Sequence, residues 1–259
     1  MSLTIVSAVN DEAILKSCLL QSPDLRSGVD LILQTGFSSA AEAYNDGIRK
    51  CKGDIIVFVH QDVYLPEGWV KRLKSAIGVL NDSDPNWGVL GVWGVQENGK
   101  YAGHVYWQQA AGQHFHGGIE VVTLDELVLI VRASSGLSFD EALAGFHMYG
   151  ADICLEATQR GMRCYAISAF CIHNAGGYRM LPLQFWRAYF FMRKKWRYRL
   201  PVKTTCTEIT TSCWPMIRWN IIRAAHLAVG QEMAHQRIAD PGLLYRELVN
   251  RQIVLPCQD

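Results

Sequence analysis

The sequence Asp54-Ile55-Ile56-Val57-Phe58-Val59, followed at once by His60-Gln61-Asp62, decides the fold. An unbroken apolar run of this length is typical of a strand that is covered on both faces of a sheet. Ligands of open α/β sheets collect beyond the carboxyl ends of such strands. An imidazole and a carboxylate at that edge predict a site for Mn²⁺ or Mg²⁺. The same residues would also fit a histidine that bonds a strand-end carbonyl and an aspartate that caps a turn.

Strands and helices alternate on both sides of this run. Leu3–Val9 is a nearly continuous apolar segment, and Asn10 or Asp11 can cap the helix that follows it. The other elements predicted in this region are a strand over Val29–Leu33 and helices over Ser38–Cys51 and from Pro66 to about Leu80. This alternation predicts an α/β fold with a mostly parallel, Rossmann-like sheet flanked by helices.

The pattern changes after the polar loop at residues 81–86. Short apolar runs broken by glycines predict strands over Gly88–Val95, Tyr101–Trp107, Ile119–Val122 and Leu127–Arg132. Helical spacing returns at Phe146–Arg160, a strand follows near Cys164–Ala169, and the chain from Leu181 onward is helical, aromatic and basic. We therefore predict an α/β domain over residues 1–180 and a helical C-terminal extension over residues 181–259.

Composition limits the class of protein. A chain of 259 residues with 49% hydrophobic residues can bury a full core, and its net charge of +1 names no partner. The eight cysteines form no Cys-x-x-Cys pair, which favours reduced core residues over disulfides or zinc. We find no signal segment, and arginines interrupt the long apolar runs. The expected location is cytoplasmic, soluble or peripheral at the inner face of the membrane.

Several motifs occur in a characteristic order. Asn45-Asp46-Gly47-Ile48, the Lys52-Gly53-Asp54 turn and the strand that ends in His60-Gln61-Asp62 resemble the N-terminal half of family 2 glycosyltransferases. The acceptor-side half of that family is similar to a second set, made of Asp125-Glu126, Phe139-Asp140-Glu141, residues 145–155, Gly161 and His173. The resemblance covers roughly residues 3–177. It implies a GT-A type fold and the transfer of a sugar, with inversion, from a nucleoside-diphosphate sugar to a glycan or lipid-linked acceptor.

The resemblance also implies a metal and donor site. Mn²⁺ or Mg²⁺ would be held by Asp62, with His60 and His173 as further ligands, although His60 replaces the first acid of the family's Asp-x-Asp motif. Residues expected at the donor are Ser7, Ala8, Asn10, Gln34, Asn45, Gln61 and Asp62. UDP is favoured over GDP or dTDP.

The general base is expected on the helix over residues 146–160. Asp152 is the first candidate, because a carboxylate in the first helical turn is held as an anion and can position a hydroxyl. His147 is the second candidate. The family's usual acidic pair falls on Tyr149 and Gly150, and neither is an acid. Asp152 would alternatively stabilise only the start of its helix.

The predicted extension begins with a basic, aromatic segment. Between Glu156 and Glu208 there is no acid, and the cations are Arg160, Arg163, Arg179, Arg187, Arg193, Lys194, Lys195, Arg197, Arg199 and Lys203. Residues 185–203 are a candidate for peripheral contact with an anionic membrane or a phosphorylated acceptor, unless the aromatic rings pack on the core. No nucleic-acid-binding signature accompanies the charges.

Two other functions fit the sequence less well. A sugar-phosphate nucleotidyltransferase would place a glycine-rich loop after the first strand, and Ser7–Lys16 contains no glycine. A catalytically decayed binding module with the same fold would explain both His60 and the missing acidic pair.

Overall fold

The computed structural model describes residues 1–176, 180–228 and 237–256. Its helices are α1 (Glu12–Ser17), α2 (Ala40–Lys50), α3 (Trp69–Ser83), α4 (Tyr149–Gln159), α5 (Leu183–Lys195), α6 (Trp214–Ala228) and α7 (Pro241–Asn250). Short 3₁₀ turns are η1 (Leu19–Gln21), η2 (Pro23–Ser27) and η3 (Ala133–Ser135).

The main sheet has seven strands, and the predicted α/β class is confirmed. In spatial order they are β2 (Asp30–Thr35), β1 (Leu3–Val9), β3 (Ile55–Val59), β11 (Val128–Arg132), β5 (Trp87–Gly91), β12 (Arg163–Ile167) and β9 (Gly118–Val121). The pairs β2–β1, β1–β3 and β5–β12 are parallel, whereas β3–β11, β11–β5 and β12–β9 are antiparallel. The sheet is therefore mixed, and its N-terminal strands are the parallel part. β11 is antiparallel to β5 because strands, and no helix, connect the two.

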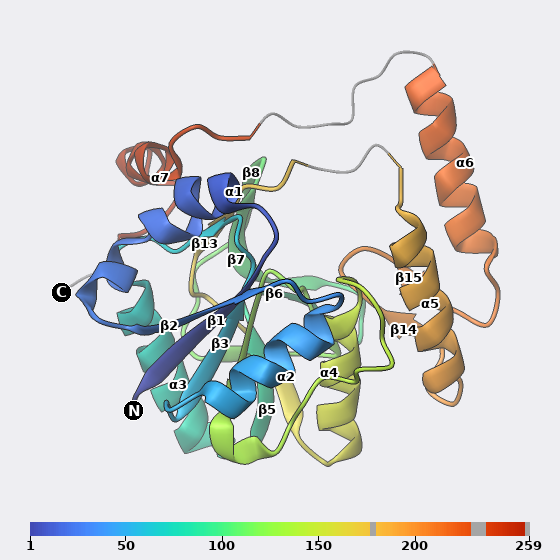
Figure 1. The fold of residues 1–259 in the computed structure, drawn as a ribbon, viewed down its shortest axis with the longest axis horizontal. Coiled ribbons are helices and arrows are strands. Elements are labelled where there is room, and N and C mark those ends of the chain that lie inside the picture. Colours follow the sequence, from blue (N-terminus) through green and yellow to red (C-terminus); the bar gives the residue numbers. More distant parts are fainter. Residues whose placement is uncertain (177–179, 229–236, 257–259) are drawn as a thin grey trace.

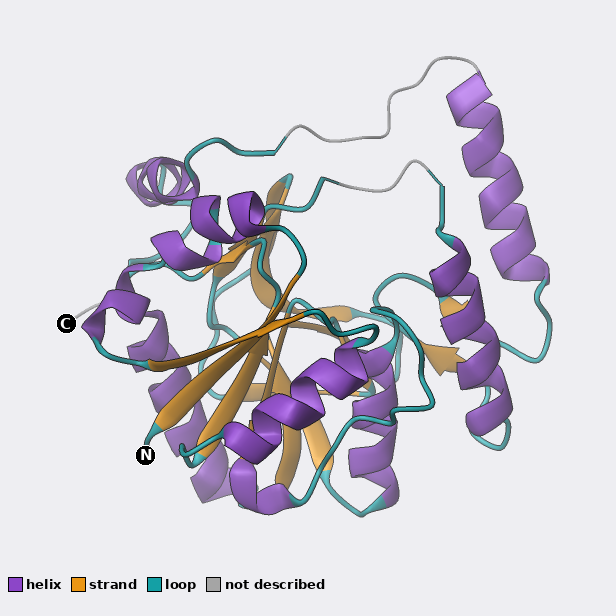
Figure 2. Cartoon of the chain, viewed as in Figure 1, coloured by secondary structure: helices purple, strands orange, loops and turns teal. Residues whose placement is uncertain are grey.

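Helices cover both faces of this sheet, as Figures 1 and 2 show. Successive strand residues point to opposite faces, so Phe58 packs with α2 and α4 while Val57 packs with α1 and α3. Both residues are fully buried. Burial on both faces explains why β3 reads as an unbroken apolar run in the sequence.

A second sheet carries the rest of the site. Its strands are β10 (Thr123–Leu124), β6 (Trp93–Val95), β7 (Tyr101–Trp107), β13 (Cys171–His173) and β4 (Val63–Tyr64), with β8 (Gln109–Gly112) beside β7. Tyr64 and Ile172 of this sheet form an apolar cluster with Tyr245 and Leu248 of α7. This cluster fixes α7 next to β4 and β13.

After residue 180 the chain continues with helix α5, which packs on α2 and α4 of the main sheet. Phe185, Tyr189 and Met192 of α5 are buried in the same cluster as α2 and α4. A short hairpin of β14 (Val202–Lys203) and β15 (Glu208–Ile209) follows, and then α6. The domain boundary at residue 180 stays a prediction.

No helix among the described residues is both long and apolar enough to span a bilayer. The seven cysteines in the described part of the chain are free thiols. Cys257, Arg179 of the basic segment and Gly177 at the end of the family resemblance lie outside the described residues.

Candidate functional site

The site begins where β3 ends. Antiparallel pairing of β11 with β3 places Val128 opposite Val59, and the His60 N–H donates to the Leu127 carbonyl at 3.1 Å. Pairing of β13 with β4 places His173 opposite Val63, and the Asn174 N–H donates to the Asp62 carbonyl at 2.8 Å. Register therefore brings His173 beside Asp62, although 110 residues separate them in sequence.

Three potential metal ligands meet here. Asp62 Oδ1 lies 3.5 Å from His173 Nε2 and 3.9 Å from His60 Nδ1. The ligand atoms of these three side chains all lie within 4.8 Å of one another, and no other such group is found within residues 1–176, 180–228 and 237–256. The expected meeting of His60, Asp62 and His173 is thus found in the structure.

Charges around Asp62 keep it ionised. Burial raises the pKa of its carboxyl, but the hydrogen bond from His173 and the charges of His173, His60 and Arg237 outweigh burial, so the pKa lies below its usual range. Arg237 Nη1 is 3.5 Å from Asp62 Oδ2. Burial lowers the pKa of His60 and favours its neutral form, whereas the Asp62 hydrogen bond and charge overcome burial to raise the pKa of His173.

Tyr149 orients His60. The Tyr149 hydroxyl donates to the Glu126 carbonyl at 3.3 Å and lies 2.6 Å from His60 Nε2. In the tautomer of His60 that carries its proton on Nε2, this contact is a hydrogen bond donated to the Tyr149 hydroxyl. The lone pair of His60 Nδ1 then faces Asp62, as a metal ligand requires.

Gln61 links this strand end to the turn between β1 and α1. Its Oε1 accepts the N–H groups of Asn10 and Asp11, each at 3.1 Å, and its amide donates to the Asn10 side chain. Asp11 caps α1, as predicted, by accepting from Ala13 and Ile14. The turn predicted to lie under the donor is therefore fixed directly to the residue between His60 and Asp62.

Ser7 and Ala8, also predicted to bind the donor, lie in β1 just before this turn. Ser7 is fully buried, and its hydroxyl has no hydrogen-bond partner among the described residues. Ala8 is partly exposed next to it. A buried hydroxyl without a partner is uncommon, and at 0% exposure Ser7 is out of reach of a ligand at the surface.

Gln34 and Asn45, also predicted to bind the donor, hold α2 instead. The Gln34 amide donates to the Ala43 carbonyl at 3.0 Å and to Asp46 at 2.8 Å, and the residue is 3% exposed. Asn45 donates to the Phe139 carbonyl and accepts its N–H, both at 2.9 Å. The polar groups of both side chains are thus used within the protein.

Both carboxylate oxygens of Asp152 are also hydrogen-bonded to other side chains of the protein. It is 2% exposed, and its two oxygens accept from Lys195 Nζ at 2.9 Å and Trp196 Nε1 at 2.7 Å. Lys195 also pairs with Asp140 at 2.8 Å and Glu156 at 2.9 Å. This arrangement favours the alternative of a structural aspartate that ties α4 to α5.

His147, the second candidate base, lies just before α4. Burial, followed by the charge of His60, lowers its pKa to about 4. Its ring contacts that of Phe185 edge-on, with centroids 5.4 Å apart. A base of such low pKa is weak at neutral pH.

Glu126 belongs to the second motif set of the sequence, but sequence reasoning gave it no role in the site. Its carboxylate accepts the backbone N–H groups of Met148, Tyr149 and Gly150 at the start of α4. Met148 has the left-handed φ of 65°, which turns these groups toward Glu126. Burial, and then the charge of Asp125, raises the Glu126 pKa well above its usual value. The signal was the Asp125-Glu126 pair just before a buried strand.

Gly150 explains how Glu126 fits. A Cβ atom on Gly150 would lie 3.0 Å from Glu126 Cγ and 2.9 Å from the Leu124 carbonyl. A side chain at position 150 and the present position of Glu126 therefore compete for the same space. Glu126 therefore places a carboxylate beside positions 149 and 150 of α4, where the chain has Tyr149 and Gly150 and no acid.

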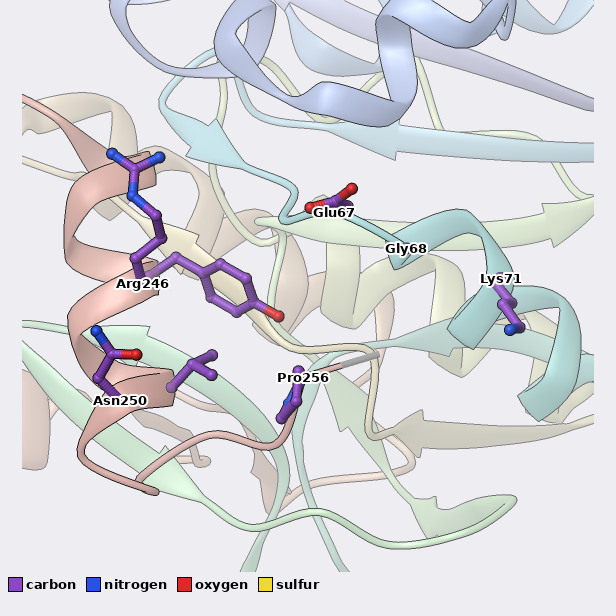
Figure 3. Close-up of a pocket in the computed structure, with 8 residues that line it drawn as sticks. Glu67, Gly68, Lys71, Arg246, Asn250 and Pro256 are labelled. Atoms are coloured by element: carbon purple, nitrogen blue, oxygen red, sulfur yellow. The ribbon is translucent and has the colours of Figure 1, made fainter. Parts of the chain in front are cut away.

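Two surface hollows lie elsewhere. One, of about 420 Å³, lies between α3 and α7 and is lined by Lys71 and Arg246 among others (Figure 3). The other, of about 550 Å³, includes Arg199 and Lys203. Neither is lined by His60, Asp62 or His173.

The model of the glycosyltransferase-like family matches residues 4–192, which is most of the chain. The chain therefore belongs to the glycosyltransferase-like family. A curated relative from Fuscovulum blasticum, described as ATP synthase subunits region ORF 6, is 34% identical over 136 residues, or 50% of this chain. That alignment covers 54% of the relative, so the chain spans about half its length.

Solved structures with a similar chain path have low sequence identity. The mannosyltransferase PcManGT from Pyrobaculum calidifontis, in complex with GDP-Man and Mn²⁺, has a TM-score of 0.49 and 14% identity, covering 98% of this chain and 81% of its own. TarS of S. aureus in complex with UDP has a TM-score of 0.47 and 14% identity, covering 74% of this chain and 64% of its own.

Proposed function

We propose that this chain transfers a sugar from a nucleoside-diphosphate sugar, with UDP as the favoured nucleotide, to a hydroxyl of a glycan or lipid-linked acceptor. The observation that carries this proposal is the meeting of His60, Asp62 and His173 at the carboxyl end of β3, beside the β1–α1 turn. Membership of the glycosyltransferase-like family supports the type of reaction. Inversion at the sugar and a cytoplasmic location are part of the proposal.

The three side chains fit a divalent cation. One carboxylate and two imidazoles are a mixed oxygen and nitrogen set, which suits Mn²⁺ better than Mg²⁺. His60 presents an unprotonated Nδ1 in the tautomer whose Nε2–H donates to Tyr149, and His173 must release a proton before it can bind metal. The cation, when bound, would neutralise charge on the leaving diphosphate. Arg237, 3.5 Å from Asp62, adds a fixed positive charge at the same place.

The donor would lie over the β1–α1 turn. Gln61 holds the backbone of Asn10 and Asp11 in place, so this turn and the Asp62 carboxylate form one rigid unit. Ala8 and Asn10 would contact the nucleoside, and the buried Ser7 would lie beneath them. Gln34 of β2 and Asn45 of α2 would support this surface without touching the donor, because their polar groups are bonded within the protein.

We assign the role of general base to Glu126. In the step proposed, an acceptor hydroxyl oxygen bonds to the anomeric carbon, and the bond from that carbon to the diphosphate oxygen breaks. The diphosphate leaves with the electron pair, and the hydroxyl proton passes to the Glu126 carboxylate. A carboxylate of raised pKa accepts this proton more readily than an ordinary glutamate.

The test is nucleotide binding and donor turnover. Calorimetry with UDP and with GDP, each with and without Mn²⁺, should show binding that Mn²⁺ strengthens, and UDP-sugars should release UDP slowly to water. His173→Gln should weaken the Mn²⁺-dependent part, whereas His226→Gln on the exposed face of α6 should leave it unchanged. Absence of binding by either nucleotide, with or without Mn²⁺, would refute the proposal.

A binding module without activity is the alternative. It is favoured by the absence of an acid at Tyr149 and Gly150 and by the commitment of Asp152 to Lys195. Nucleotide binding without release of UDP from any UDP-sugar, and without transfer to added glycans, would establish it.

A further inference from the structure

Helix α6 exposes an apolar surface. Of its residues only Met216 is buried, and the helix lies at the edge of the molecule outside α5 (Figure 1). Trp214 is 61% exposed, Ile221 57% and Ile222 45%. Ile217 and Trp219 are also among the exposed large apolar residues. Isolated exposed apolar residues are ordinary, but a group of this kind on one helix marks an interaction surface.

Helical spacing aligns these residues. Trp214, Ile217 and Ile221 lie three and four residues apart, so their side chains form one stripe along the helix. Ile222 widens the stripe. Tryptophan at one end of an otherwise aliphatic stripe is typical of helices that lie in a lipid interface, because the indole ring prefers the headgroup region.

The segment that contains the stripe is rich in cations. From Leu183 to Ala228 the only acid is Glu208, whereas α6 carries the exposed Arg218. Arg187 and Lys194 of α5 and Arg197 after it are exposed as well. Lys195 is neutralised by three carboxylates and is not part of this set.

We propose that α6 docks this protein on an anionic phospholipid surface, with Trp214, Ile217 and Ile221 entering the interface and Arg218 meeting the headgroups. Charge decides between lipid and a second copy of the chain as the occupant. Two copies joined along α6 would bring Arg218 of each copy together, and α6 has no acid to pair with it. Anionic headgroups complement these charges.

This surface differs from the one that sequence predicted. Several aromatic side chains of residues 185–203 pack inside the protein, since Phe185, Tyr189 and Trp196 are buried. The cations of that segment remain outside and would add to the attraction. The proposal does not depend on the transferase activity, since it rests on α6 and α5 alone.

The test is co-sedimentation of the full chain with vesicles. Equimolar phosphatidylcholine and phosphatidylglycerol should bind the protein, whereas phosphatidylcholine alone should bind it weakly, and added salt should reduce binding to the anionic vesicles. The double variant Ile217→Ser, Ile221→Ser should lose about tenfold or more in partitioning. Arg218→Gln should lose about fivefold on anionic vesicles only.

Matched controls are available on other helices. Val79 on α3 and Leu243 on α7 are 46% and 48% exposed, so Val79→Ser and Leu243→Ser remove similar apolar area away from α6. These variants should bind vesicles as the parent does. Far-ultraviolet circular dichroism and the Tm should be unchanged in all variants, because the replaced side chains are exposed.

Two results would overturn the proposal. The first is that anionic vesicles bind the parent and the double variant equally, or bind neither. The second is a dimer, seen by analytical ultracentrifugation of the parent without lipid, that the double variant dissociates. That second result would assign the stripe to a second copy of the chain.

Discussion

Replacing Asp152 with asparagine removes one of three carboxylates around Lys195 Nζ. Lys195 keeps Asp140 at 2.8 Å and Glu156 at 2.9 Å, and the new amide oxygen can still accept from Trp196. The loss is therefore one charge-assisted hydrogen bond, worth roughly 1.5–3 kcal/mol. In a chain of this size each kcal/mol lowers the Tm by about 2–4 °C. We expect a fall of about 3–12 °C in Tm.

Lys195→Met is the matched variant. It leaves Asp140, Asp152 and Glu156 facing one another without a cation, and breaking a buried ion pair in this way costs about 3–5 kcal/mol. Thermal unfolding should therefore rank Lys195→Met below Asp152→Asn. UDP release from a UDP-sugar with Mn²⁺, measured well below both Tm values, should stay near the wild-type rate for Asp152→Asn.

The opposite pattern would refute this placement of Asp152. An unchanged Tm together with UDP release lowered by a factor of about 10²–10⁴ would mean that Asp152 acts in the chemistry. Asp152 of α4 would then be the general base, as the sequence predicts.

Three further predictions follow from the site and the second sheet. Glu126→Gln should lower UDP release by about 10²–10⁴ while calorimetry shows unchanged UDP affinity with Mn²⁺, and normal turnover would place the base elsewhere. Gln61→Ala should release the N–H groups of Asn10 and Asp11 and weaken UDP binding about tenfold, whereas unchanged affinity would separate this turn from the donor. Burial, helped by the charges of His114 and Arg72, lowers the pKa of His104 to about 4. The neutral imidazole therefore contributes to the stability of the fold above pH 6.5, the ordinary pKa of histidine. This contribution, up to about 3 kcal/mol, is lost as the pH falls toward 4. Urea unfolding across that range should show a smaller pH dependence for His104→Gln than for the parent, and equal slopes would contradict the assignment.

Strands with a strong local pattern could be predicted from sequence. Leu3–Val9 and Tyr101–Trp107 are found with the predicted bounds, and the predicted strand over residues 88–95 proved to be two strands, β5 and β6, in different sheets. The short strands β4 and β13 were not predicted, because two or three residues carry no periodicity. Those strands nevertheless set the register that joins His173 to Asp62.

The candidate site also has one part that the sequence could predict and another that only the structure shows. His60, Asp62 and His173 lie at strand ends, so their position in the sequence indicated a common edge of the fold. The partners of Asp152 and Asn45 lie 43 and 94 residues away in sequence, and motif spacing cannot show which distant group occupies a side chain. Sequence pointed to both residues as candidates, but only the structure shows that their polar groups are already bonded.

Glu126 and α5 show two further limits of sequence reasoning. The space that Glu126 fills exists because residue 150 is glycine, and that competition depends on how the start of α4 meets the end of β10. The aromatic residues of α5 allowed both a membrane contact and packing on the core. Tertiary packing decided for the core, since Phe185 and Tyr189 are buried.

The most direct test of the central claim is Mn²⁺-dependent UDP binding by Asp62→Asn. Calorimetry and the electron paramagnetic resonance signal of free Mn²⁺ would be compared with those of the parent chain and of Asp82→Asn, an exposed aspartate on α3. We predict that Mn²⁺ strengthens UDP binding about tenfold or more in the parent and in Asp82→Asn, and not in Asp62→Asn. Equal Mn²⁺-dependent UDP affinity in all three proteins would contradict the account, because Asp62 would then hold neither metal nor donor.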